Sequence, residues 1–282
     1  MQAIQSVTLN PAVYSGLEQE VGGIAPGRRA DLIFLESLEE CAVKDVWIGG
    51  KHVAEDGQSL VHATPIAWPA DMSHSLRRLT PAVTADSFKI AAPALAPKIR
   101  VMSLINQTIT TERLVEVNAA SGFVEADLRA DLLKVAMFDR HHKSGKIAFG
   151  LLQGFGARVG AVGLTTNLDE NTLMVVGADD ADMALCANAL IECGGGIAIA
   201  HNGAIVERVE FTIGGIFSLE PWRSVGRGLR RFQDRLSAMG SPFAKPIFAL
   251  NFLPFVTLPS LRITARGLVN AKERKIVSLF VD

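Results

Sequence analysis

The residues best suited to chemistry lie in a polar segment between two apolar runs. Residues 165–171 (TTNLDEN) separate the β-type runs 161–164 and 173–176, and polar loops beside sheets often carry ligand contacts. The carboxylate of Asp169 can accept a hydrogen bond from an amino or ring N–H group, and the amide of Asn171 can donate and accept. The alternative is an ordinary turn rich in Asn and Asp. Asp169 is therefore a candidate catalytic and substrate-binding residue, and Asn171 a candidate substrate-binding residue.

The six histidines give no metal-binding pattern. His141 and His142 are adjacent, and neighbouring side chains on a strand point to opposite faces, so the two should not bind one metal ion together. The others form neither H-x-H nor H-E-x-x-H, and no Ser-His-Asp or Cys-His arrangement follows from the spacing. We predict no metal site in this chain. These other histidines are His52, His62, His74 and His201.

Two glycine-rich segments do not fit phosphate sites. In residues 154–160 (GFGARVG) the third glycine is one position late for the dinucleotide fingerprint, and more strand follows where a helix is required. We interpret this segment as a turn. The triple glycine 194–196 follows a predicted helix over 179–193, where the helix dipole is negative, so we expect it to end that helix.

A second predicted helix, residues 221–239, carries five arginines. They could bind phosphate, but we expect Trp222 and Leu229 to face the core, which makes the arginines the solvated side of an amphipathic helix. The arginines are Arg223, Arg227, Arg230, Arg231 and Arg235.

Composition limits the class of protein. The 282 residues are 49% hydrophobic and 20% charged, which favours a folded chain over a disordered one. Lys and Arg total 28 against 29 Asp and Glu, so there is no electrostatic footprint for nucleic acid or an anionic membrane. Three scattered cysteines do not make a disulfide framework, and we expect neither a signal peptide nor a spanning segment. We expect a cytoplasmic protein that binds neither nucleic acid nor membrane.

The order of elements predicts an α+β fold. Strands are expected over 30–35, 43–48 and 51–54, the last two joined as a hairpin through Gly49-Gly50. Residues 2–17 should form a short helix that ends at Asn10-Pro11 and a second turn that ends at Gly16. Proline-rich residues 61–97 read as a linker or an extended wrapping segment. Further strands are expected over 99–105, 114–117, 133–138, 147–152, 197–200 and 204–211.

Two parts of the sequence carry a resemblance to a known family. VTLNPAVYSGLEQEVGGIAPGRRADLIFLESLEE is similar to the end of an amidohydrolase barrel running into the small β domain, where a TLNPA helix and G-x-I-x-P-G-x-x-A-D are typical. HHKSGKIAFGLLQGFGARVGAV, followed by DMALCANALIECGGGIAIAHNGAIVE, is similar to the domain after the barrel in adenine deaminases. Nearly the whole chain thus resembles the carboxyl-terminal part of adenine deaminase, a member of the amidohydrolase superfamily.

The resemblance implies a division of the chain and a chemistry. It implies the end of a barrel and part of a small β domain at residues 1–60, a linker at 61–97 and an adenine deaminase C-terminal-like α+β domain at 98–282. The family hydrolyses adenine to hypoxanthine and ammonia with a metal-bound water, and its ligands lie at the carboxyl ends of barrel strands. The resemblance implies that these 282 residues correspond to the part of the family sequence after those ligands. We therefore expect no cofactor in this chain, a divalent metal (Mn, Fe or Zn) in the missing barrel, and no activity unaided.

The candidate segment departs from the family pattern. Family members typically carry A-H-D-S-H-N, where residues 167–172 here read N-L-D-E-N-T. Asp169 is retained and both imidazoles are replaced, which implies that even a reconstituted enzyme could have altered specificity.

The truncation implies a partner. Strands over 30–54 would expose unpaired edges and apolar faces, which a separate barrel-containing chain or a homo-oligomer would cover; a fragmentary gene would also explain the truncation. The leading interpretation is a portion of an adenine deaminase that depends on a barrel supplied elsewhere and binds a small-molecule purine. The alternatives are a non-catalytic purine-binding or assembly module, and part of an amidohydrolase with another cyclic amidine or amide substrate.

Overall fold

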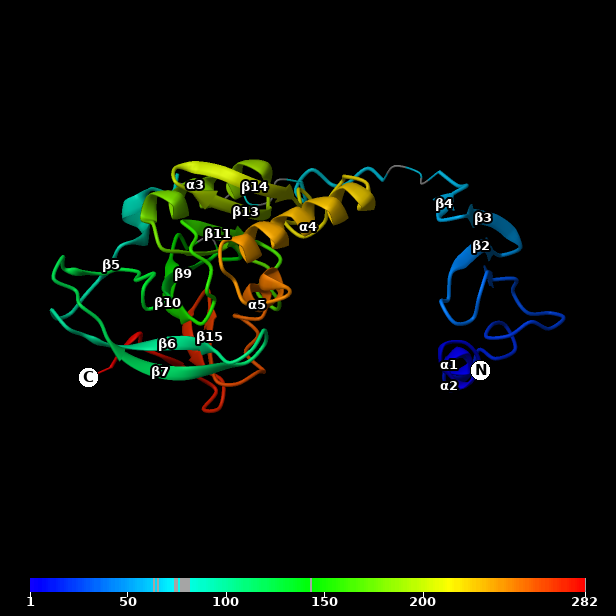
Figure 1. Cartoon of the computed structure of the whole chain (residues 1–282), viewed down its shortest axis with the longest axis horizontal. Helices are drawn as coiled ribbons and strands as arrows, with labels where there is room; N and C mark the ends of the chain where they lie inside the picture. The colour runs from blue at the N-terminus through cyan, green and yellow to red at the C-terminus, as the bar shows by residue number, and fades with distance from the viewer. Residues whose placement is uncertain (63, 65, 74–75, 77–81, 143, 282) are drawn as a thin grey trace. The chain divides into compact units, whose positions relative to one another are not determined.

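The structure of the protein is a computed structural model that describes residues 1–62, 64, 66–73, 76, 82–142 and 144–281. The chain divides into two compact units, Met1–Ala67 and Trp68–Asp282. Figure 1 shows both with helices and strands, and the predicted α+β class is confirmed. Among the described residues, none of the helices has the length and apolar character needed to cross a membrane. The boundaries expected at 60 and 97 stay predictions.

The first unit has two short helices and a four-stranded antiparallel sheet in the order β1-β2-β3-β4. The predicted hairpin through Gly49-Gly50 is confirmed, and both glycines have positive φ. The break expected at Asn10-Pro11 was wrong. The helices part at Thr8, and Pro11 lies in the first turn of the second helix, where its missing N–H costs nothing. The elements are α1 (Gln2–Val7), α2 (Leu9–Tyr14), β1 (Leu32–Leu35), β2 (Val43–Ile48), β3 (Lys51–Glu55) and β4 (Gln58–Ser59).

The second unit is built on a nine-stranded sheet in the order β14-β13-β11-β12-β9-β10-β6-β18, with β7 also paired to β6. All pairs are antiparallel except β10 with β6. The strands expected here are confirmed, although β7 begins four residues before the predicted start. The strands are β6 (Lys98–Leu104), β7 (Thr110–Glu116), β9 (Leu132–Phe138), β10 (Ile147–Gln153), β11 (Ala161–Leu164), β12 (Met174–Gly177), β13 (Gly196–His201), β14 (Ala204–Glu210) and β18 (Phe280–Val281).

Both faces of this sheet are covered, because its central strands are apolar on each side. Along β9, Val135 and Met137 belong to one core while Ala136 and Phe138 belong to the other, as the two-residue period of a strand requires. Helix α3 (Asp180–Cys193) packs on the second face. The first face carries α4 (Trp222–Ala238), α5 (Pro246–Asn251) and a small sheet of β15 (Leu261–Thr264), β16 (Gly267–Asn270) and β17 (Lys275–Val277).

Local signals decide the ends of α3. The Asp179 side chain accepts a hydrogen bond from the Asp182 N–H at 2.8 Å, which is an N-cap, and Gly194 ends the helix with φ 94°. Both features confirm the prediction. In α4 the five arginines are exposed, as predicted, but Trp222 does not face the core. It is 76% exposed, because it is the first residue of the helix, and the apolar residues that pack on the core lie further along, at Val225, Leu229, Phe232 and Leu236.

Part of the proline-rich stretch packs on the second unit. Residues 61–97 contain the 3-10 helix η2 (Ala85–Phe88) and strand β5 (Ile90–Ala91). Strand β5 pairs with β8 (Phe123–Val124). The Asn188 amide of α3 exchanges two hydrogen bonds with the Val83 backbone, and Phe88 is fully buried. His74, named among the histidines above, lies outside the described residues.

Candidate functional site

The loop between β11 and β12 is anchored by polar side chains that point inward. Asn167 is fully buried, and its amide donates to the Thr172 carbonyl at 2.6 Å and accepts from the Thr172 N–H at 3.3 Å. The Thr172 hydroxyl donates to the carbonyl of Phe138 at 2.6 Å. A buried amide paired on both sides closes the loop on itself, so its backbone is held in one conformation.

The start of the loop is fixed to two other segments. The buried Thr165 hydroxyl donates to the carbonyl of Gly215 and accepts from the N–H of Gly196 at 2.8 Å. The Thr166 hydroxyl donates to the Asn251 side chain at 3.0 Å, which connects the loop to the end of α5. These contacts leave only the tip of the loop facing outward.

The candidate residues Asp169 and Asn171 lie at that tip, and both side chains are exposed. Each has a left-handed backbone, with φ 70° and 42°, which Asp and Asn tolerate better than most residues. Leu168, beside them, is 37% exposed. The structure therefore places both candidates on one outward-facing tip, where they can meet a molecule from outside this domain.

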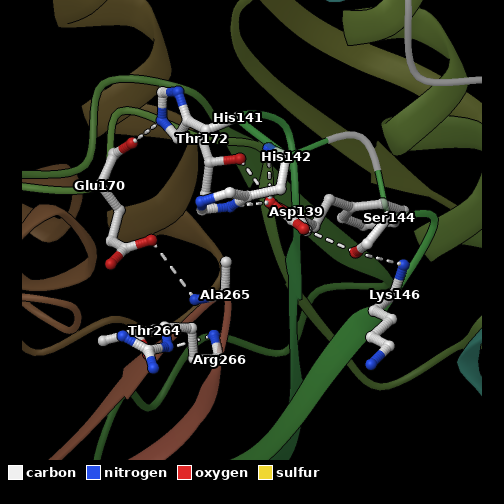
Figure 2. A network of polar contacts seen from close by, with 11 residues as sticks. Asp139, His141, His142, Ser144, Lys146, Glu170, Thr172, Thr264, Ala265 and Arg266 are labelled. Atoms are coloured by element: carbon white, nitrogen blue, oxygen red, sulfur yellow. Dashed lines mark hydrogen bonds and ion pairs between the residues drawn. The ribbon is translucent and has the colours of Figure 1, made fainter.

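The turn that follows β9 lies next to the loop, and Figure 2 shows the contacts between them. Asp139 accepts hydrogen bonds from the Ser144 hydroxyl at 2.5 Å and from the backbone N–H of His142 at 3.0 Å; the His142 Nδ1 lies 3.1 Å away. Its carboxyl is nearly buried. The Ser144 hydroxyl, followed by the His142 contacts, lowers the pKa of Asp139 to about 2. Asp139 is therefore an ionised structural centre of this turn.

Three segments distant in sequence meet at the loop. The Nη1 of Arg140 donates to the Asn171 carbonyl at 2.8 Å, and its Nη2 donates to the Gly214 carbonyl at 2.7 Å. The His141 Nε2 lies 2.7 Å from the Glu170 carbonyl oxygen. The Glu170 carboxylate accepts from the Ala265 N–H at 3.3 Å, at the turn between β15 and β16 (Figure 2).

The prediction that His141 and His142 point to opposite faces assumed strand geometry, and that assumption was wrong. They lie in the turn after β9, because Asp139 draws the chain back through the His142 N–H. Each ring has a partner within the turn or loop. No group of three or more His, Cys, Asp or Glu that could hold a metal ion occurs within the described part of the chain.

The glycine segment 154–160 is irregular, in agreement with its interpretation as a turn. The N–H groups of Gly154 and Gly156 both donate to the Asp131 carboxylate at 2.9 Å. An acidic side chain of the protein therefore fills the small anion-binding nest that these glycines make.

Two buried cations were missed by the sequence reasoning. Lys134, 1% exposed at the side chain, lies 2.6 Å from the Asp180 carboxylate; burial raises the pKa of Asp180, and the Lys134 ammonium opposes this. Arg262, also 1% exposed, binds only backbone carbonyls. Burial lowers the pKa of Arg262 to about 10, so it is still charged at neutral pH. The available signal was a single basic residue within an apolar strand.

An open hollow of about 500 Å³ has none of the loop residues 165–171 in its lining. It is bounded by the turn between β6 and β7 and by the segment before α5, with Gln107, Phe243 and Phe248 among its lining residues. None of the sequence-predicted candidates lines it.

The fold is that of a two-part chain: a small β unit with two helices, and an α+β domain with an outward polar loop. Residues 107–275 match the family model of the adenine deaminase C-terminal domain, and residues 1–53 match that of the amidohydrolase family. The chain belongs to the adenine deaminase C-terminal domain family.

The relatives agree with this assignment. An adenine deaminase of Moorella thermoacetica is 38% identical over 282 residues, which cover 99% of this chain and 47% of the relative. Adenine deaminases of Clostridium botulinum (strain ATCC 19397 / Type A) and Cenarchaeum symbiosum are 36% and 31% identical, over 100% and 98% of this chain and 47% and 45% of their own lengths. The chain thus spans about half the length of the curated relatives it matches.

Proposed function

We propose that this chain is the carboxyl-terminal portion of an adenine deaminase-like enzyme, which hydrolyses adenine to hypoxanthine and ammonia. The observation that carries the proposal is the match of almost the whole chain to proteins named adenine deaminase. The catalytic divalent metal, Mn, Fe or Zn, would be held by a barrel that is not part of these 282 residues. The described residues of this chain do not fit such a metal, because no three His, Cys, Asp or Glu side chains among them are grouped so that they could hold it.

The role of this chain would be to present the loop tip to the substrate. The carboxylate of Asp169 would accept a hydrogen bond from the amino group or a ring N–H of the purine, and the Asn171 amide would donate or accept beside it. The fixed backbone supports this role, because a pre-positioned contact costs little ordering on binding.

The first unit supports dependence on a partner. Ala12 is its one buried hydrophobic residue among those described, while many large apolar side chains are exposed. A unit without a core of its own is expected to be covered by another surface. We propose a separate barrel-containing chain, with a homo-oligomer as the alternative. The exposed residues include Val7, Val13, Tyr14, Ile24, Ile33, Phe34 and Leu38.

A change of substrate within the same chemistry is the second candidate. Leu168 and Asn171 occupy the positions of the two family histidines, and both face outward on either side of Asp169. The tip therefore has the family carboxylate without the imidazoles, which favours a different cyclic amidine or amide as substrate.

We place the protein in the cytoplasm, where its three free cysteines would stay reduced.

The test is adenine-dependent ammonia release with Mn, Fe or Zn added and bound metal determined. The purified chain would be assayed alone and with the portion of the Moorella enzyme that it does not match. We expect turnover only in the mixture, reduced about tenfold or more by Asp169→Asn and unchanged by Glu116→Gln, an exposed carboxylate on β7. Turnover by the chain alone with stoichiometric metal would overturn the dependence on a barrel.

Two results would redirect the proposal. Purine binding without turnover in the mixture would favour a non-catalytic binding or assembly module. Turnover of another amidine or amide, with adenine left intact, would favour the changed-substrate alternative.

A further inference from the structure

An exposed apolar surface lies on the second unit, beside the start of α4. Phe217, Leu219 and Trp222 are 56%, 65% and 76% exposed. Ile216 and Trp68 are exposed as well, by just over a third. We call these five residues the apolar patch. Large aromatic side chains gathered on a surface in this way are typical of protein contact sites.

The patch is held in shape by hydrogen bonds within the same unit. Ile213 and Phe217 exchange two backbone hydrogen bonds of 3.0 Å, which close a tight turn. The N–H of Gly214 donates to the Met72 carbonyl at 2.8 Å, which joins this turn to the segment that carries Trp68. The Trp68 and Phe217 rings are stacked with centroids 6.4 Å apart. A surface that is already ordered binds a partner at a smaller entropic cost.

The patch is connected directly to the candidate site. The carbonyl of Gly214 accepts from Arg140, and the carbonyl of Gly215 accepts from Thr165. These two donors also hold the loop that carries Asp169. The backbone beside the patch and the loop are therefore held by the same two side chains.

The helix that begins at the patch is strongly basic. Between Trp222 and Ala238 it contains five arginines and one acidic residue, Asp234. Arg231 is paired with Glu207, and the arginines are all exposed. A partner that fits this surface would have an apolar face surrounded by acidic residues.

We propose that the apolar patch and the basic side of α4 dock the barrel portion of an adenine deaminase-like enzyme, through an acid-rimmed apolar surface of that portion. This inference rests on the proposed function. It is supported by the continuity with the loop, by the charge of α4, and by the length of the relatives, about half of which this chain does not span. Docking here would bring the loop tip to the barrel, where the substrate is held.

The experiment measures binding of the full 282-residue chain to the unmatched portion of the Moorella enzyme, by isothermal titration at 50 and 300 mM salt. We expect Trp222→Ser and Phe217→Ser each to weaken binding about tenfold or more. Arg227→Glu should weaken binding mainly at low salt. Leu95→Ser, which changes an exposed apolar residue outside the patch, is the matched control and should bind as the wild type does. Circular dichroism of each variant checks that it is folded.

Each result decides the question. Absence of binding by the wild-type chain, or equal affinity of the patch variants, overturns the docking site. If the chain alone sediments as a dimer and Trp222→Ser makes it a monomer, the patch binds a second copy of this chain. That result would overturn the docking of a barrel portion. If the mixture releases ammonia and the patch variants release it at the same rate, the proposed function stands and this docking surface is rejected. Patch-dependent binding without ammonia release would retain this surface and reject the function.

Discussion

Replacing Arg262 with methionine removes the one group that joins four backbone carbonyls beneath the small sheet. Its guanidinium donates to the carbonyls of Phe252 at 2.9 Å, Leu258 at 3.0 Å and Thr108 at 2.7 Å, and also to that of Pro259. The residue is 1% exposed, so no water replaces the lost donors. Methionine keeps an unbranched apolar stem while removing every donor.

The magnitude follows from two opposing effects. A hydrogen bond to a charged group contributes about 1.5–3 kcal/mol, so four of them would contribute on the order of 6–12 kcal/mol. Burying the guanidinium costs several kcal/mol, which the substitution recovers. We therefore expect Arg262→Met to lower the free energy of unfolding by about 3–5 kcal/mol, a large share of the roughly 5–15 kcal/mol of an average domain.

The assay is urea denaturation at pH 7, followed by circular dichroism. Arg262→Lys should lose less stability than Arg262→Met, because the ammonium keeps three donors. It should still lose some stability, because three donors cannot reach all four carbonyls. The control is Arg129→Met at an exposed position, which should change the free energy of unfolding by less than about 0.5 kcal/mol. A loss below about 1 kcal/mol for Arg262→Met would refute the reasoning, since it would mean that the carbonyls do not depend on this cation.

Acid and glycine substitutions provide the other tests. The folded pKa of Asp139, about 2, lies below its ordinary value of 3.8, so its carboxylate stabilises the fold above about pH 4 and loses this contribution as the pH falls toward 2. The contribution is on the order of 1–2 kcal/mol; Asp139→Asn should flatten the fall in urea midpoint between pH 5 and 2, and an unchanged slope would contradict this. Gly196→Ala should prevent folding or cost more than about 3 kcal/mol, because φ is 141° and a Cβ would lie 2.1 Å from the Val209 carbonyl oxygen. Gly226→Ala, at an open position within α4, should instead raise the thermal midpoint through a gain of about 0.5–1 kcal/mol; equal effects at the two positions would be inconsistent with the backbone argument.

Elements decided by local interactions were predicted from the sequence. Helix α3 needs an aspartate at its start, a glycine after its end and a 3.6-residue apolar period between them, and all three are properties of adjacent residues. The same holds for the hairpin at Gly49-Gly50, where positive φ is required at both positions. The resemblance to the adenine deaminase family likewise needed only the order of the residues.

Elements that depend on distant contacts were missed. Helix α5 has six residues and lies in a stretch interrupted by prolines, and it is held by burial of Ala249 and Leu250 against the sheet. Short helices are marginal on their own, so nothing in the local sequence predicts it. Trp222 was placed in the core on helical period alone, yet the helix starts beyond the edge of the packed surface.

The candidate site divides in the same way. The sequence by itself determined that residues 165–171 form a polar segment between strands, with Asp169 and Asn171 as its candidate ligands. Only the tertiary structure decided that Asn167 and Thr172 turn inward and leave that tip outward. It also decided that Arg140 and Glu170 join the tip to segments far away in the chain. The physical reason is that periodicity and capping act over a few residues, whereas the direction of a loop is set by whichever distant backbone groups its side chains can satisfy.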